Sequence, residues 1–78
     1  MHFAKVEKWP DGASLELYDG NMKVLESESF ADLYTLNFHL QTLASKHKIQ
    51  EALMVIHDKK SGKVDLSLAQ GENSFFVS

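Results

Sequence analysis

Short stretches of strand-like composition open the chain, with apolar and polar residues alternating most clearly in the second. These segments are residues 2–9 (HFAKVEKW), 14–18 (SLELY) and 22–26 (MKVLE). Pro10, Asp11 and Gly12 separate the first two segments, and we expect Gly12 to adopt a positive φ in that turn. The pattern predicts an antiparallel meander of three strands.

The second hairpin has a self-consistent register if its type I′ turn is placed on Asp19 and Gly20. Apolar residues then face each other and opposite charges pair, with Leu17 opposite Met22, Glu16 opposite Lys23 and Leu15 opposite Val24. In the first strand, Phe3 and Val6 are out of phase. We therefore expect a β-bulge at residues 5–7.

Residues 28–48 change to a helical period. Ser29 is the expected N-cap, with Asp32 completing a capping box, so that the helix begins at Phe30 and stops by Lys48. Ile49 is expected to fold back over the last turn. The apolar stripe that packs on the sheet contains Leu33, Leu36, Leu40, Leu43 and Ala44.

The remaining chain predicts a second hairpin. "ALMVIH" at 52–57 is apolar at four successive positions, which is typical of a strand covered on both faces. "KVDLSLA" at 63–69 alternates, with one side formed by Val64, Leu66 and Leu68, and Gly62 fits a bulged turn before it.

These elements predict an α+β fold in one domain, residues 1–78. It is a two-layer sandwich with an antiparallel sheet of about five strands, element order βββαββ, and one helix on one face. The opposite face then needs either a polar surface or another molecule. The fourth strand is expected to be central, or to be covered by a second subunit.

Composition excludes several classes of function. The chain has 78 residues, a net charge of −3 and no cysteine, so disulfides and thiolate metal sites are excluded. All eight cations are lysines, which disfavours direct sequence-specific nucleic-acid recognition. No apolar run approaches membrane-spanning length and no signal peptide is visible, so we expect no membrane partner and a cytoplasmic location.

Catalytic and metal-binding patterns are absent from the sequence. His57 with Asp58 or Asp65 is the one pair that resembles a base and its orienting group, and no serine, glycine loop or metal-ligand set accompanies it. Lys59, Lys60 and Lys63 are too few for strong phosphate-backbone binding. The sequence therefore predicts no catalytic residue, no cofactor and no metal, and hence a protein that is not an enzyme.

Two apolar features need an explanation. Tyr34 and Phe38 lie about 100° and 140° from Leu33 around the helix, on the flank of the buried stripe. Either the chain itself covers them or they form an exposed ridge that docks a partner. Phe75, Phe76 and Val77 either add a strand to the sheet edge or mediate self-association in a homodimer.

A group of carboxylates is the third candidate. It comprises Glu16, Asp19, Glu26, Glu28 and Asp32. Such a group either keeps a surface solvated, or it imitates nucleic-acid phosphates and attracts a basic partner.

The remaining features all concern binding, so the sequence predicts a small non-enzymatic protein-binding module. With "WPDGASLELYDGNMKVLE" followed by one helix and "ALMVIHDKKSGKVDLSLA", the chain resembles small phage-encoded anti-defence proteins, the anti-CRISPR inhibitors among them, in size, acidity and element order. The resemblance implies an inhibitor that occupies a surface of a nucleic-acid-handling immune complex. The carboxylates, Tyr34 and Phe38 would then form the contact surface. The alternative is a homodimeric structural or regulatory subunit that assembles through the helix flank and the C-terminal tail.

Overall fold

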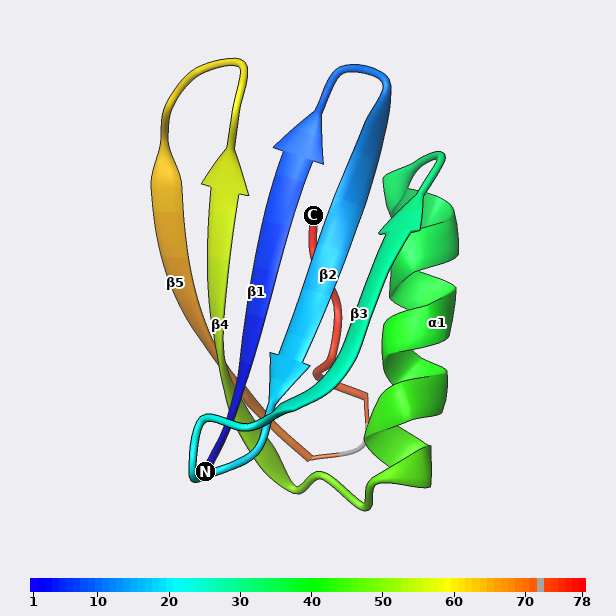
Figure 1. The fold of residues 1–78 in the computed structure, drawn as a ribbon, viewed down its shortest axis with the longest axis vertical. Coiled ribbons are helices and arrows are strands. Elements are labelled where there is room, and N and C mark those ends of the chain that lie inside the picture. Colours follow the sequence, from blue (N-terminus) through cyan, green and yellow to red (C-terminus); the bar gives the residue numbers. More distant parts are fainter. Residues whose placement is uncertain (72) are drawn as a thin grey trace.

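The computed structural model describes residues 1–71 and 73–78, which form a five-stranded sheet with a helix on one side of it (Figure 1). The elements are β1 (His2–Trp9), β2 (Gly12–Tyr18), β3 (Val24–Phe30), α1 (Leu33–Lys46), β4 (Glu51–Asp58) and β5 (Val64–Gln70). The predicted α+β class and element order are confirmed.

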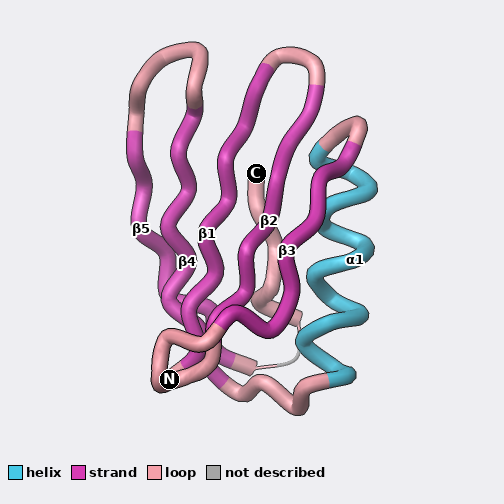
Figure 2. Tube along the Cα trace, viewed as in Figure 1, coloured by secondary structure: helices cyan, strands magenta, loops and turns pink. Residues whose placement is uncertain are grey.

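The strand order is β3-β2-β1-β4-β5 (Figure 2). Neighbouring strands are antiparallel except β1 and β4, which run parallel, so the sheet is mixed and not wholly antiparallel as predicted. The parallel pair arises because the chain leaves the sheet at its β3 edge, returns through α1 and enters again beside β1. β4 thus lies in the interior of the sheet, as its apolar sequence predicts.

Gly12 differs from its expected role. Pro10 and Asp11 form the turn, while Gly12 is the first residue of β2, pairs with Trp9 and is not among the glycines with positive φ. A Cβ atom at this position would lie 3.0 Å from the carbonyl oxygen of Phe30 on β3. Glycine therefore eases a close approach of two strands at this position and does not serve a positive φ.

The predicted register of the second hairpin is wrong. Leu17 pairs with Glu26, not with Met22, and the register shifts between Leu17 and Tyr18. The Asp19 carboxylate accepts hydrogen bonds from the backbone N–H groups of Asn21 and Lys23, at 2.8 and 2.9 Å. This side chain builds a turn longer than two residues, and Met22, at φ 65°, takes the left-handed conformation in it.

The prediction of a β-bulge in β1 is also wrong. β1 pairs without interruption with both of its neighbours, and the register shift lies in the β2–β3 pair. Phe3 and Val6 are out of phase because they belong to opposite faces of the sheet.

The helix begins later than predicted. Ser29 and Phe30 belong to β3, and Asp32 is the N-cap, with its carboxylate accepting from the backbone N–H of Thr35 at 2.8 Å. Strand pairing with β2 prevails over the local capping signal at Ser29. The end of the helix agrees with the prediction, since the Ile49 N–H donates to the Ala44 carbonyl at 2.8 Å and Ile49 is buried.

The core lies between the sheet and a layer made by two segments. α1 lies nearest to β2 and β3. The C-terminal tail, residues 73–78, runs on the same side of the sheet (Figure 1) and adds Phe75 and Val77, which are 2% and 1% exposed, to the core. The predicted edge strand does not form among these residues, because the tail packs on the sheet face and not along its edge.

Asn37 fixes the tail to the helix. Its side-chain Nδ2 donates to the Val77 carbonyl and its Oδ1 accepts from the Val77 N–H, both at 2.7 Å. Within residues 1–71 and 73–78, Asn37 is the polar residue that is buried in the core. Its amide replaces the strand partner that Val77 lacks, so that both buried backbone groups of Val77 are satisfied.

Replacing Asn37 with Ala should lower the free energy of unfolding by about 2–3 kcal/mol, because two buried backbone groups lose their partners. Denaturant unfolding followed by circular dichroism measures the change. Gln41→Ala, on the exposed side of the same helix, is the control and should change stability by less than about 0.5 kcal/mol. An Asn37→Ala variant as stable as the Gln41→Ala variant would contradict this role.

Candidate functional site

Three aromatic side chains, two on one flank of α1 and one in the C-terminal tail, are exposed to solvent. Tyr34, Phe38 and Phe76 are 82%, 71% and 57% exposed. They line a groove of ≈ 450 Å³ between the helix and the tail, together with Leu33, Asn37, Gln41, Val77 and Ser78. We call this surface the aromatic groove.

The position of each aromatic follows from local structure. Tyr34 and Phe38 are one helical turn apart, so they lie on the same flank. Burial alternates along the tail, with Phe75 and Val77 buried and Phe76 exposed, and a tight turn bonds the Phe76 N–H to the Ser74 carbonyl at 3.0 Å. Because two hydrogen bonds from the Asn37 side chain hold the Val77 backbone, the adjacent Phe76 stays next to Tyr34 and Phe38.

The sequence prediction for the tail is only partly consistent with this arrangement. Phe75 and Val77 were candidates for self-association, but both are buried within their own chain. Phe76 is the member of the three that another molecule can contact. The sequence prediction missed the contribution of Phe76 to the groove and the role of Asn37. The alternation of buried and exposed residues in "SFFVS" could have revealed the contribution of Phe76.

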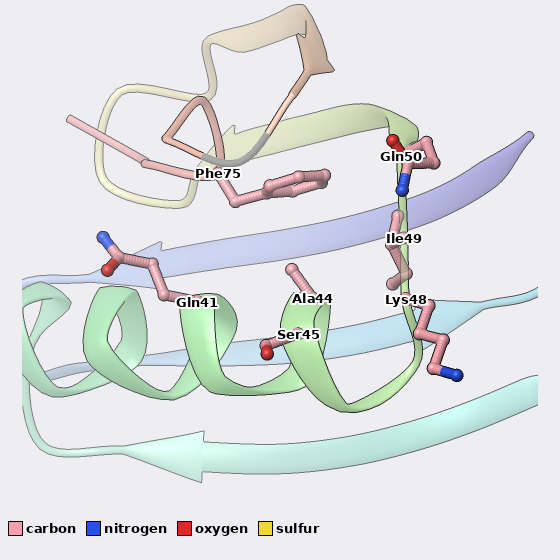
Figure 3. A pocket seen from close by; sticks show the side chains of 7 residues that line it. All are labelled: Gln41, Ala44, Ser45, Lys48, Ile49, Gln50 and Phe75. Atoms are coloured by element: carbon pink, nitrogen blue, oxygen red, sulfur yellow. The ribbon is translucent and has the colours of Figure 1, made fainter.

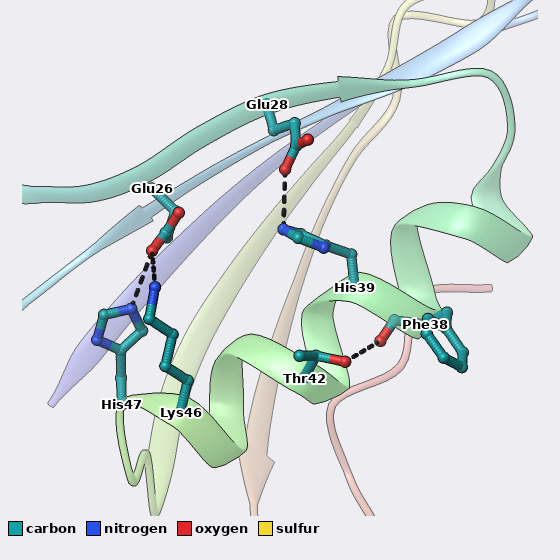
Figure 4. A network of polar contacts seen from close by, with 7 residues as sticks. All are labelled: Glu26, Glu28, Phe38, His39, Thr42, Lys46 and His47. Carbon is teal, nitrogen blue, oxygen red and sulfur yellow. Dashed lines mark hydrogen bonds and ion pairs between the residues drawn. The ribbon is translucent and has the colours of Figure 1, made fainter.

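The opposite flank of α1 carries a polar contact with β3 (Figure 4). Glu26 Oε2 lies 3.2 Å from His47 Nε2 and 3.3 Å from Lys46 Nζ. Glu28 Oε2 lies 2.8 Å from His39 Nε2. We call these residues of β3, of α1 and of its C-cap, His47, the polar clasp.

The polar clasp changes the chemistry of one carboxyl group. Hydrogen bonds from His47, and then from Lys46, hold the pKa of Glu26 below its ordinary value. The clasp exists because Glu26 pairs with Leu17 and Glu28 with Leu15, so both carboxylates lie on the face of the sheet that α1 covers. Two of the five candidate acids thus contact the helix of their own chain.

The other three candidate acids also have local structural roles. Glu16 lies 3.7 Å from Lys5 on the neighbouring strand. Hydrogen bonds from the backbone of Lys23 and of Asn21 lower the pKa of Asp19, and that from Thr35 lowers the pKa of Asp32. The five carboxylates therefore do not gather with Tyr34 and Phe38 into one surface.

Acid–base and metal chemistry find little support in the geometry. His57 pairs with Val64, whereas Asp65 pairs with Ile56 and thus lies on the other face of the sheet. The described residues include no group of three histidine, aspartate or glutamate side chains that could hold a metal ion. In the same part of the chain, no helix is long and apolar enough to cross a membrane.

A second hollow of ≈ 420 Å³ lies at the C-terminal end of α1 (Figure 3). Ala44, Ile49 and Phe75 form its apolar side. Gln41, Ser45, Lys48 and Gln50 contribute the polar side chains, and Lys48 is the charged residue among them. This lining contains neither a nucleophile paired with a base nor a pair of carboxylates, so we assign it no chemistry.

Comparison with protein-family models, with curated proteins and with solved structures finds no match to this chain. The interpretation of the site therefore depends on its own geometry.

The polar clasp predicts how the stability of the protein depends on pH. A carboxyl group whose pKa is lowered by folding stabilises the protein above its ordinary pKa, here 4.5, and this contribution is lost as the pH falls through the lowered value. Glu26→Gln should therefore be less stable than the unmodified protein at about pH 6, and the difference should shrink as the pH falls below 4.5 and through the lowered pKa of Glu26.

Urea unfolding at several pH values measures this difference. Asp65→Asn, which removes the same charge from an exposed position of β5, is the control for net charge. A stability difference for Glu26→Gln that stays constant across this pH range would show that the carboxylate charge does not stabilise the clasp.

Proposed function

We propose that this chain is a small protein-binding module that acts stoichiometrically, not as an enzyme, and that the aromatic groove is its contact surface. The observation that carries the proposal is the exposure of Tyr34 and Phe38, 82% and 71%, next to the exposed Phe76. Large exposed aromatics that lie together are costly in water, and such residues dominate the binding energy of protein interfaces.

The construction of the groove supports the same proposal. Tyr34 and Phe38 project from a regular helix, and Phe76 is held by the bidentate contact of Asn37 with the adjacent Val77. Little conformational freedom of the backbone is lost when a partner binds such a surface. The partner expected from this lining is a protein that inserts apolar side chains between the helix and the tail.

The finer proposal is an inhibitor that occupies a surface of a larger nucleic-acid-handling complex of a bacterial defence system. It is supported by the resemblance to phage-encoded anti-defence proteins and by the net charge of −3, which favours a basic partner. The internal partners of Glu16, Glu26 and Glu28 weaken the case for a dedicated acidic contact surface. The apolar groove is therefore the main contact in this proposal.

Replacing Tyr34 and Phe38 together with Ser should abolish binding while the fold persists. Each side chain is exposed, so each change should alter stability by less than about 0.5 kcal/mol. The loss of two interface anchors should weaken partner binding by at least about a hundredfold. Capture of partners from bacterial lysate by a tagged chain identifies the partner, and titration calorimetry with the purified partner measures the affinity.

Thr42→Ala is the matched control, because Thr42 lies one turn beyond Phe38 and outside the groove lining. Retained partner binding in the double variant would overturn the proposal. A captured complex that handles nucleic acids, bound in a salt-sensitive way, supports the inhibitor form of the proposal. A captured partner that does not handle nucleic acids, and whose binding does not depend on salt, supports the protein-binding module but not the inhibitor form of the proposal.

A further inference from the structure

The face of the sheet that is turned away from α1, which we call the open face, carries a continuous apolar band. In Figure 1 the sheet lies in front of the helix and the tail, so this face is toward the viewer. Strand pairing aligns one apolar row across the whole sheet, formed by Leu68, Leu53, Phe3, Tyr18 and Val24. Leu66 and Val55 extend this row on β5 and β4, and Leu66 is 69% exposed.

The carboxylates of the open face have partners within the chain. Glu16 lies 3.7 Å from Lys5, Glu7 lies 3.1 Å from Lys59, and Glu51 accepts a hydrogen bond from Gln70 at 2.8 Å. A second open face placed over this one therefore meets two lysine–glutamate pairs beside an apolar band, while Glu51, bonded to a neutral amide, keeps its charge at the start of β4. The paired charges of two identical faces do not repel each other.

We propose that a second copy of this chain packs on the open face, which gives a four-layer dimer in the order helix, sheet, sheet, helix. A two-fold axis parallel to the strands places the apolar row of one copy over the same row of its partner. Because the row crosses all five strands, the two rows still face each other when one sheet is shifted sideways over the other. Sheets that pack face to face in this way form a core about 10 Å thick.

The size of the face reaches the lower limit for a specific interface. A sheet of this width and of seven-residue strands measures roughly 24 by 24 Å, from strand spacing and rise per residue. Two such faces bury about 1,100 Å² in total, just above the area of about 1,000 Å² that a specific interface needs. Pairing of two β5 edges is the competing arrangement, but it leaves the apolar row exposed.

This dimer is independent of the proposed partner groove. Tyr34 and Phe38 lie on the helix layer, on the far side of the sheet from the open face. Both grooves therefore remain accessible on the outer surfaces of the dimer, so that one dimer can hold two copies of a partner.

The test introduces one charge on either side of the same strand. Leu66→Glu places a carboxylate on the open face, whereas Ser67→Glu places it at the next, also exposed position of β5, on the opposite face. The mass is measured by analytical ultracentrifugation over a range of protein concentrations. We expect the unmodified chain and Ser67→Glu to sediment at twice 8.8 kDa, and Leu66→Glu to weaken dimerisation by at least roughly a hundredfold.

Three outcomes would overturn the inference. The first is a monomer of the unmodified chain at about 1 mM, where contacts with micromolar dissociation constants are saturated. The second is a dimer that Leu66→Glu leaves intact. The third is a dimer that both variants weaken equally, which is the result expected for edge pairing of β5. The Tyr34→Ser, Phe38→Ser variant should remain dimeric, which separates this inference from the function of the groove.

Discussion

A single helix is too narrow to cover a five-stranded sheet, and most of this structure follows from that constraint. A helix with its side chains is about 10–12 Å wide, whereas strands about 4.8 Å apart make a sheet of this size roughly twice as wide. α1 covers β2 and β3, and the tail supplies the missing cover through Phe75 and Val77. The tail pairs with no strand, so the buried Asn37 side-chain amide supplies the hydrogen bonds that a neighbouring strand would give to Val77.

The same constraint separates the two flanks of the helix. The flank toward β3 is held by charged and polar contacts, and the flank toward the tail carries exposed aromatics. Sequence periodicity predicted both the buried stripe and the position of Tyr34 and Phe38 beside it, because these depend only on helical geometry. The exposure of Tyr34 and Phe38 could not be predicted from the helix alone. It depends on the path of the C-terminal tail, which could either cover these side chains or run beside them.

The errors of the sequence prediction have a common cause. The N-cap at Ser29 and the turn on Asp19 and Gly20 were both derived from local signals that are sound in isolation. At Ser29, strand pairing of β3 with β2 prevails over the capping signal. At Asp19, the carboxylate binds two backbone N–H groups and builds a longer turn than the predicted one. Glu26 and Glu28, expected in a surface patch of carboxylates, contact His47, Lys46 and His39 at or beside the helix.

The parallel pairing of β1 with β4 has a consequence for how the molecule forms. The meander β1–β3 and the hairpin β4–β5 each depend on contacts near in sequence, but His2 pairs with Ala52. Closing a loop of this length costs about 3.5 kcal/mol of chain entropy before the central seam of the sheet gains any contact. Joining these two units should therefore limit the folding rate, and until they join, the inner edges of β1 and β4 are open to the wrong strands.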